Sequence, residues 1–473
     1  MIFTQIIRKE WRELFRSRIA VWLLTILMTL SAIALWRSSV KYKEAFLHRK
    51  DAIAHMREKF TGQGAVNPHS AAHYGHYVYK PVNILGIIDE GVNPYTGISL
   101  RLEAHQQHEA MFSSSQASSS MVRFGAFRLG LLLQILIPLF IVFVCHDAVS
   151  RERENQTLKI ALIQGLGLRR LVWGKIFAYT LLWWALLLLN ISIAWLMSSA
   201  ILQEHFNMGR LISIGILYGI YYFFVTSVSI YISVASRSSA TALITLLSVW
   251  LICTVVLIKA TSNIGENIAP MLTKNEMDRR ISEDNRNGIN GHDPGNERTK
   301  RFKDSVLQKY KVDSVNQLPV NLDGLTMQAD EEYHNMVYDR HLGEIQKTIR
   351  RQNSVTAVSS FINPYAGIRN LSKALAGTDV EQHFDFTRQA ENYRRFIIKK
   401  MNDEMAYGGS KTDDWNWAVN VDYWKNIKDF RYTPPSVGGV LRNHITEIIA
   451  VISWLLLCIG IVHFTSNRYS YDN

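Results

Sequence analysis

Cysteine is scarce in this chain, with three among 473 residues. Cys145, Cys253 and Cys458 all lie within or at the edge of strongly apolar segments, which leaves no cysteine in the hydrophilic stretches. This distribution excludes a disulfide scaffold of the kind that small secreted domains use. Any hydrophilic domain of the chain must therefore be stabilised by packing.

The sequence also lacks the motifs of catalysis and of nucleotide binding. It contains no nucleophile elbow, zinc-protease histidine pair or catalytic dyad. Residues 408–412 read Gly-Gly-Ser-Lys-Thr, but they have neither the earlier glycine nor the Gly-Lys order of a phosphate-binding loop. Asp330, Glu331 and Glu332 are typical of a solvated helix face. We expect that the chain is not an enzyme by itself and has no cofactor of its own.

What the chain does have is long apolar segments. Hydrophobic residues make up 48% of it and charged residues 19%, so the average hides a division into apolar and hydrophilic parts. Six apolar segments have roughly 18 or more residues, enough to cross a ~30 Å hydrocarbon core. We therefore predict an α-helical integral membrane protein with six transmembrane helices. They cover residues 19–36, 124–145, 171–202, 211–234, 240–258 and 445–465.

Lysine and arginine gather on one side of these spans. They are frequent in residues 1–18 and in the loop 146–170, and Arg237 precedes the fifth span. Positively charged loops stay in the cytoplasm, so both termini, including the tail 466–473, are predicted to be cytoplasmic. Because topology explains the formal net charge of +12, and no stretch interleaves clustered basic and aromatic residues, we expect no nucleic-acid partner.

The first 18 residues predict an interfacial helix. Apolar residues recur there at steps of three and four, with lysine, arginine and glutamate between them. Phe3, Ile7, Trp11 and Phe15 would face membrane lipid while the helix lies in the cytoplasmic headgroup layer. The alternative is a helix buried against the other spans.

Two long hydrophilic insertions, residues 37–123 and 259–444, are predicted to lie on the side opposite the termini. In the first, residues 42–60 continue the first span as a helix, and residues 76–100 form short strands and turns. A second helix, from about Leu102, is expected to lead into the second span. The first insertion would thus be a pair of helical stalks with a small irregular cap.

The second insertion is predicted to be mostly helical and, at ~185 residues, long enough for its own core. Helices are expected over residues 326–352, over 358–376 with an interruption near Pro364, and over 380–407, and residues 284–299 are expected to form a loop. We expect the two insertions to pack into one unit, because the second exposes too many aromatic residues for a free surface. The alternative is that those aromatic residues form its own core.

The loop after the second span carries the most informative pattern. Residues 147–175 form a densely charged amphipathic stretch between two spans. This stretch resembles the corresponding loop of ABC-2 type transporter permeases, with Gln156 where those usually have glycine. The residues that carry the resemblance are Arg151, Glu152, Arg153, Glu154, Thr157, Leu158, Gly174 and Lys175. We predict that residues 151–164 contain a helix that couples the chain to an ATPase.

Three stretches of the first insertion resemble a bacterial subfamily that is grouped with permeases for the maturation of multicopper enzymes. They are residues 67–81, 89–97 and 102–105. The resemblance implies a multi-pass subunit of the bacterial inner membrane with large periplasmic domains. It also implies two partner ATPase subunits, which bind ATP and Mg, and a second permease, either identical or homologous. The implied function is export, or movement of the periplasmic domains. One alternative is a mechanotransmission scaffold that acts on a periplasmic or outer-membrane protein, and another is metal delivery to copper enzymes.

Histidines of the first insertion form the one candidate metal site. His69, His73 and His76 are four and three residues apart, and His105 and His108 are three apart, so each set would share a face if helical. Zinc or copper accepts such ligands. Pro68 and Gly75 argue against a regular helix, and the alternative is a packed aromatic cap.

Polar residues within the second span are the remaining candidates. Arg128 is close enough to the membrane surface to reach the headgroups. Gln134 is predicted to form a hydrogen bond between helices.

Overall fold

A computed structural model describes residues 2–111, 113, 128–199, 207–293 and 295–468. Helices dominate these residues, and six helical segments are long and apolar enough to cross a membrane. This confirms the predicted class of α-helical integral membrane protein. The spans are formed by α2 (Arg18–Thr61), by Leu129–Glu154, by α9 (Leu168–Met197), by α10 (Met208–Ala235), by Ser239–Ile268 and by the first part of α20 (Ile445–Arg468).

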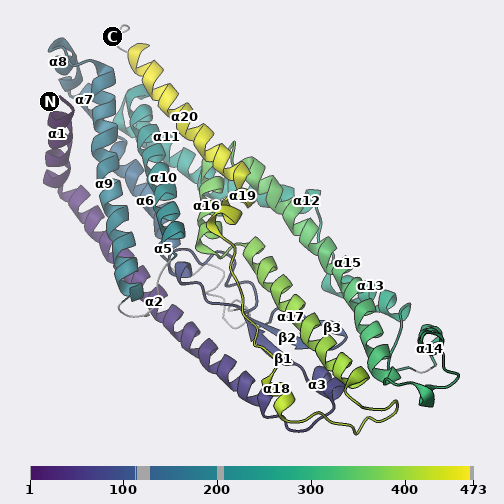
Figure 1. Cartoon of the computed structure of the whole chain (residues 1–473). Coiled ribbons are helices and arrows are strands. Elements are labelled where there is room, and N and C mark those ends of the chain that lie inside the picture. Colours follow the sequence, from purple (N-terminus) through teal and green to yellow (C-terminus); the bar gives the residue numbers. More distant parts are fainter. Residues whose placement is uncertain (1, 112, 114–127, 200–206, 294, 469–473) are drawn as a thin grey trace.

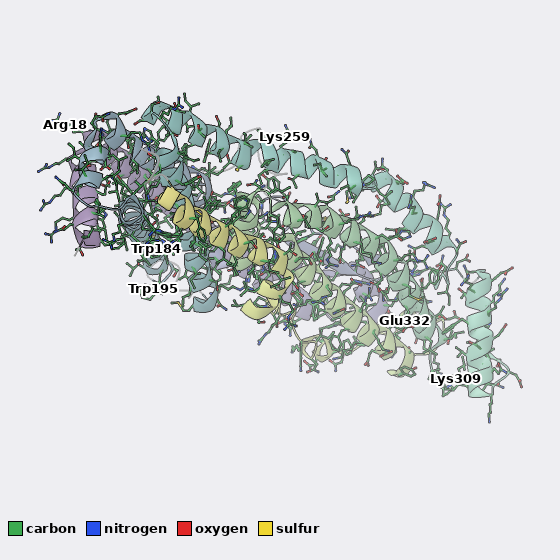
Figure 2. The ribbon with its side chains drawn as sticks, turned by 90° about the horizontal axis from the view of Figure 1, so that it is seen from above. Arg18, Trp184, Trp195, Lys259, Lys309 and Glu332 are labelled. Carbon is green, nitrogen blue, oxygen red and sulfur yellow. The ribbon has the colours of Figure 1, made fainter. Side chains whose placement is uncertain are left out.

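The molecule is elongated, with the apolar helices at one end and the two insertions at the other (Figure 1). Figure 2 shows Arg18, at the start of α2, and Lys309, in α14, at opposite ends. Residues of the first span and its predicted extension form one unbroken helix, α2, of 44 residues. At 1.5 Å per residue, α2 is about 66 Å long. The Ser17 hydroxyl caps its start, and Gly62 follows its end.

The second and fifth spans each contain a wider helical turn. In the second span, η3 (Leu132–Leu136) lies between α5 (Leu129–Leu131) and α6 (Ile137–Cys145). In the fifth, η5 (Ile252–Val256) lies between α11 (Ser239–Leu251) and α12 (Leu257–Ile268). Both are π-helical turns. Such turns are rare in proteins, and those that do occur are often found at functional sites. The fifth helix continues to Ile268, beyond the predicted end of the span at residue 258.

The first insertion contains a three-stranded antiparallel sheet in the order β1-β2-β3. Its elements after α2 are α3 (Pro68–Tyr74), β1 (His76–Tyr79), η1 (Ile84–Ile87), β2 (Ser99–Glu103) and β3 (Gln106–Gln107). The prediction of a helix from about Leu102 is wrong for the described residues. Residues 99–103 instead pair with β1, with Leu102 opposite His76 and Leu100 opposite Val78. Residues 114–127 lie outside the described part of the chain.

The second insertion is helical, as predicted. Residues Val380–Tyr407 form α17 with the predicted bounds, and the helix expected over 326–352 is part of the longer α15 (Leu322–Ser359). The predicted interruption near Pro364 separates α15 from α16 (Pro364–Ala376), where Asn363 caps the new helix. The other helices are α13 (Lys274–Arg286), α14 (Glu297–Tyr310), η6 (Val315–Gln317), α18 (Asp422–Lys425) and α19 (Val437–Asn443).

The two insertions share their hydrophobic cores, which confirms the prediction that they pack together. Ala71, Ala72 and Ala104 of the first pack with a group of buried side chains of the second, including Ile398, Met401 and Trp424. Strand β2 packs against Phe386 of α17. The buried Arg394 guanidinium donates a hydrogen bond of 3.0 Å to the carbonyl oxygen of Glu103. The insertions therefore form one extramembrane unit.

This unit rests on the membrane helices through α16. Tyr365, Ile368 and Leu371 of α16 belong to the same buried cluster as Tyr218 and Tyr222 of the fourth span. The chain joins this unit to the first, second, fifth and sixth spans, and the packing of α16 adds the fourth span, α10, as a further support. The extramembrane unit is thus in direct contact with a membrane-spanning helix.

Candidate functional site

The charged loop after the second span forms two short helices, α7 (Ser150–Glu154) and α8 (Thr157–Ile163). Both lie at the end of the molecule that carries α1 (Ile2–Arg16) and the two termini (Figure 1). Gln156 joins the two helices with a φ of 61°, in the left-handed region where glycine is favoured. This geometry explains why a glycine at this position suits the loop.

Two charged side chains of α7 contact the turn between the fourth and fifth spans. Arg153 donates hydrogen bonds to the carbonyl oxygens of Val234, at 2.8 Å, and of Ser236, which end the fourth span. The Glu154 carboxylate accepts hydrogen bonds from the amide and hydroxyl of Ser239, at 2.8 and 2.9 Å, at the start of α11. Because these contacts hold the turn between the fourth and fifth spans, α7 is fixed to both of them.

Gly174 allows α1 to lie against the third span. A Cβ atom at this position would meet Ile6 of α1 at 2.8 Å from Cδ1 and 2.9 Å from Cγ2. Ile6 is buried at this contact. The Trp11 indole donates a further hydrogen bond of 2.8 Å to the carbonyl oxygen of Ala178. We call α1, α7 and residues 168–179 of α9 the basal block.

Lys175 lies at the centre of the basal block. Its side chain is fully buried, and its Nζ lies 2.5 Å from Oε1 of Glu10 and 3.0 Å from Oε1 of Glu152. Lys9 also contacts Glu152, at 2.5 Å, and the Tyr179 hydroxyl donates a hydrogen bond of 2.9 Å to Glu10. A buried lysine with two carboxylate partners fixes α1, α7 and α9 relative to one another. Glu10 was expected on the polar face of α1, but it is buried.

The opposite side of the loop faces outward. The Arg151 side chain is 70% exposed, and Lys159 is also exposed. On α8, Leu158 is buried whereas Ile160 and Ile163 are 55% and 76% exposed. Thr157 bonds its hydroxyl to the carbonyl oxygen of Glu152, at 3.1 Å, and so closes the turn. The outward face therefore combines two large apolar side chains with basic ones.

Helix α1 presents a second exposed apolar surface. Ile6, Glu10 and Leu14 are buried against the chain, whereas Phe3, Trp11 and Phe15 are exposed and Ile7 is half-buried. The helix thus has one apolar stripe in contact with protein and another that is uncovered. This combines features of both sequence hypotheses for α1, and the place of the helix in a membrane stays a prediction.

Gln134 forms the hydrogen bonds between helices that its position predicted, and it does so in the wider turn η3. Its Nε2 donates to Asp89 of the first insertion at 2.7 Å, to Tyr218 of the fourth span at 3.0 Å and to Ser372 of α16 at 3.2 Å. This buried cluster connects the second and fourth spans to both insertions. Arg128 pairs with Glu90 of the first insertion at 2.5 Å.

The candidate histidines divide into two groups. His69, His73 and His105 come together with His292 of the second insertion, so that one ring nitrogen of each lies within 4.8 Å of the others. His76 lies elsewhere, with its ring packed at a tilt against Phe60, and its pKa is lowered to about 4 by burial and then by Arg57. His108 contacts the Glu103 carboxylate. We call His69, His73, His105 and His292 the histidine cluster.

Local structure explains this grouping. Residues 68–74 do form a helix, α3, because Pro68 stands in its first turn and Gly75 follows its end, positions that favour rather than oppose a helix. His69 and His73 therefore share a face, one turn apart. Burial, and then the neighbouring His73, lowers the pKa of His69 to about 4, and burial lowers that of His105 to about 3 despite Asp330. Both imidazoles are neutral at neutral pH.

Residues 408–412 have a structural role. The Asn321 amide donates hydrogen bonds to the Ser410 hydroxyl, at 2.8 Å, and to the Lys411 carbonyl oxygen, at 2.9 Å. The Thr412 hydroxyl accepts one from the amide of Leu322, at the start of α15. These contacts stabilise the first turn of α15.

Comparison with known families assigns two parts of the chain. Residues 100–256 match the family described as ABC-2 family transporter protein, and residues 274–433 match a domain of unknown function, DUF3526. The first match covers the second, third and fourth predicted spans and most of the fifth. It also includes the basal block except for α1. The second lies within the second insertion. No curated protein matches the chain.

Proposed function

Since its residues 100–256 identify this chain as an ABC-2 type permease, we propose that it is the transmembrane subunit through which a separate ATPase drives movement of the extramembrane unit. The observation that carries the proposal is the basal block together with the exposed face of the adjoining helix α8. Ile160 and Ile163 offer an exposed apolar contact, and the basic side chains around them suit an acidic groove on a partner.

The inner side of the same loop supports force transmission. Glu152 contacts Lys175 and Lys9. Arg153 is hydrogen-bonded to the end of the fourth span, and Glu154 to the start of the fifth. A push on α8 would therefore move the basal block and the fourth and fifth spans together. Since α1 leads directly into α2, the displacement would continue along a helix about 66 Å long to the extramembrane unit.

The energy would come from partner subunits. Residues 408–412 are engaged at the start of α15. In our proposal ATP and Mg bind to the partner ATPase. In our proposal two ATPase subunits dock on two permeases in the inner membrane, with both termini cytoplasmic and the extramembrane unit periplasmic. The second permease is identical or homologous.

Export and mechanical work on a partner are the two forms that this movement can take. The unbroken α2 favours mechanotransmission, because it connects the basal block to the extramembrane unit without a hinge. Export would need a passage between two permeases, and the mostly uncovered fifth span is the surface where a second copy or lipid would lie. Transport of a substrate by reconstituted complex would favour export.

The docking surface is tested by co-purification. The double variant Ile160→Glu/Ile163→Glu should release the ATPase from the membrane-inserted permease, because two carboxylates replace the apolar contact. Met336→Glu is the matched control, since Met336 is also an exposed apolar side chain, 61% exposed, but lies on α15 in the second insertion. ATPase that stays bound to the double variant as it does to the control would refute the assignment of α8.

A further inference from the structure

The histidine cluster brings four imidazoles together from three separate elements. His69 and His73 come from α3, His105 from the turn between β2 and β3, and His292 from the loop between α13 and α14. Nε2 of His73 lies 3.0 Å from Nε2 of His69 and 3.2 Å from Nε2 of His292. Ligand nitrogens around a tetrahedral zinc ion are roughly 3.3 Å apart, for bonds of 2.0 to 2.1 Å. These two distances are close to the spacing in a metal site, and all four ring nitrogens lie within 4.8 Å of one another.

A chain of hydrogen bonds determines which nitrogen of His69 carries the proton. The Glu332 carboxylate is acceptor-only, so Gln328 donates to it from Nε2 at 3.0 Å and presents its oxygen to Asn402. Asn402 then donates to Gln328 from Nδ2 at 3.2 Å, which turns its own oxygen toward Nδ1 of His69, at 3.2 Å. Nδ1 is therefore protonated, and the lone pair of Nε2 faces the cluster.

His105 has two carboxylates beside its Nδ1. Its Nδ1 lies 3.4 Å from Asp330 and 3.6 Å from Glu331, and carboxylates on this side favour a proton on Nδ1. Both ring nitrogens of His105 are buried and make no hydrogen bond among the residues described, so the carboxylates act on Nδ1 through their charge while Nε2 has no partner. A carboxylate behind a ligating histidine is the usual way in which proteins orient such a ligand and raise its basicity. His105 also has a φ of 61°, which histidine adopts at a cost.

Asp330 also positions the fourth histidine. Its carboxylate accepts a hydrogen bond of 3.1 Å from the amide of Gly291, next to His292. It contacts His334 at 2.7 Å on its other oxygen. His73 and His292 are exposed and line a cavity of about 1090 Å³, so an ion can reach the cluster from solvent.

We propose that His69, His73, His105 and His292 bind a divalent transition-metal ion of the zinc and copper class. Imidazole nitrogens suit these borderline ions, whereas Mg²⁺ and Ca²⁺ prefer oxygen ligands and monovalent copper prefers sulfur. The ion connects the first insertion to the second, because three ligands come from one and His292 from the other. This site is separate from the basal block and does not depend on the coupling proposed for it.

Metal titration of the purified full chain in detergent tests the proposal, with Zn²⁺ and Cu²⁺ as probes and Mg²⁺ as the negative ion. The wild type should bind one equivalent of Zn²⁺ or Cu²⁺, and bound Cu²⁺ should show nitrogen couplings in its electron paramagnetic resonance spectrum. His73→Ala and His292→Ala should each weaken binding at least about 100-fold, more than the 10- to 100-fold typical of a lost supporting residue. Both side chains are exposed, so these variants should fold.

His108→Ala is the matched control, because His108 lines the same cavity but contacts Glu103 rather than the cluster. It should bind like the wild type. Asn402→Ala, which removes the partner of His69, should weaken binding by a smaller factor than either ligand variant. A wild type that binds neither ion would make the cluster a purely hydrogen-bonded one and overturn the proposal. Binding that survives His292→Ala would overturn it too, because the ion would lie elsewhere.

Discussion

Replacing Lys175 with methionine should open the basal block. Lys175→Met keeps the length of the side chain but removes the charge that faces Glu10, whose side chain is 2% exposed, and Glu152, which keeps Lys9 as a partner. Removal of one member of a buried ion pair leaves an uncompensated charge and costs about 3 to 5 kcal/mol. At 1.4 kcal/mol for each factor of ten, local opening becomes roughly two to three and a half orders of magnitude more frequent.

Cys145 provides the assay, because it is buried at the end of α6 close to this network. In a Cys253→Ser/Cys458→Ser background, the rate at which a thiol reagent labels Cys145 reports opening of the block. Lys175→Met should be labelled faster by the factor above, and addition of Glu10→Gln should restore part of the protection, because it removes the buried carboxylate that has lost its nearest cation. Lys159→Met is the control. If Lys175→Met is labelled no faster than this exposed-site control, the ionic network does not hold the block together.

Three further predictions concern single positions. Gln156→Gly should stabilise the chain by about 1 kcal/mol, because Gln156 is left-handed, whereas Gln156→Val should destabilise it, and melting temperatures in detergent compare the two. Burial lowers the pKa of His444, but hydrogen bonds to Asp379 and Glu447 raise it to about 9. Its stabilising contribution should be complete below about pH 6.5 and be lost as the pH rises through about 9, so the melting temperature of the wild type should fall more over that range than that of His444→Gln. Finally, a cysteine at Lys309 should react with a membrane-impermeant thiol reagent in cells with a permeabilised outer membrane, and one at Gln156 should not; the reverse would invert the topology.

The sequence predicted the parts of the fold that depend on local pattern. The helix 380–407 was found with its observed bounds because Asp379 caps its start and a glycine follows its end. The six spans were found because their length and hydropathy are sufficient criteria. The stretch from Leu102 was predicted wrongly, since it contains good helix formers and its strand conformation is decided by pairing with the distant β1.

The candidate sites depended on contacts between distant residues, and sequence reasoning found them only in part. Gly174 and Lys175 were identified as a motif, but their contacts with Ile6 and Glu10 of α1 could not be read from spacing. His292 was missed because it stands alone in a loop of the second insertion, far along the chain from His105. An indication was available in the run of asparagine, glycine and aspartate around it, which fixes loop conformation.

The shared cores of the two insertions have a consequence for biosynthesis. The hydrophobic cluster around Leu102 of strand β2 includes Phe386 of α17. The ribosome adds Phe386 only after four further transmembrane segments have been made. At 5 to 20 residues per second, the intervening chain takes roughly 15 to 60 s to make. Throughout that interval the first insertion has no partner for its apolar surface, so nascent chains need protection from aggregation or proteolysis outside the membrane. A chain that stops before α17 would remain unfolded there, which gives the cell a means to discard incomplete copies.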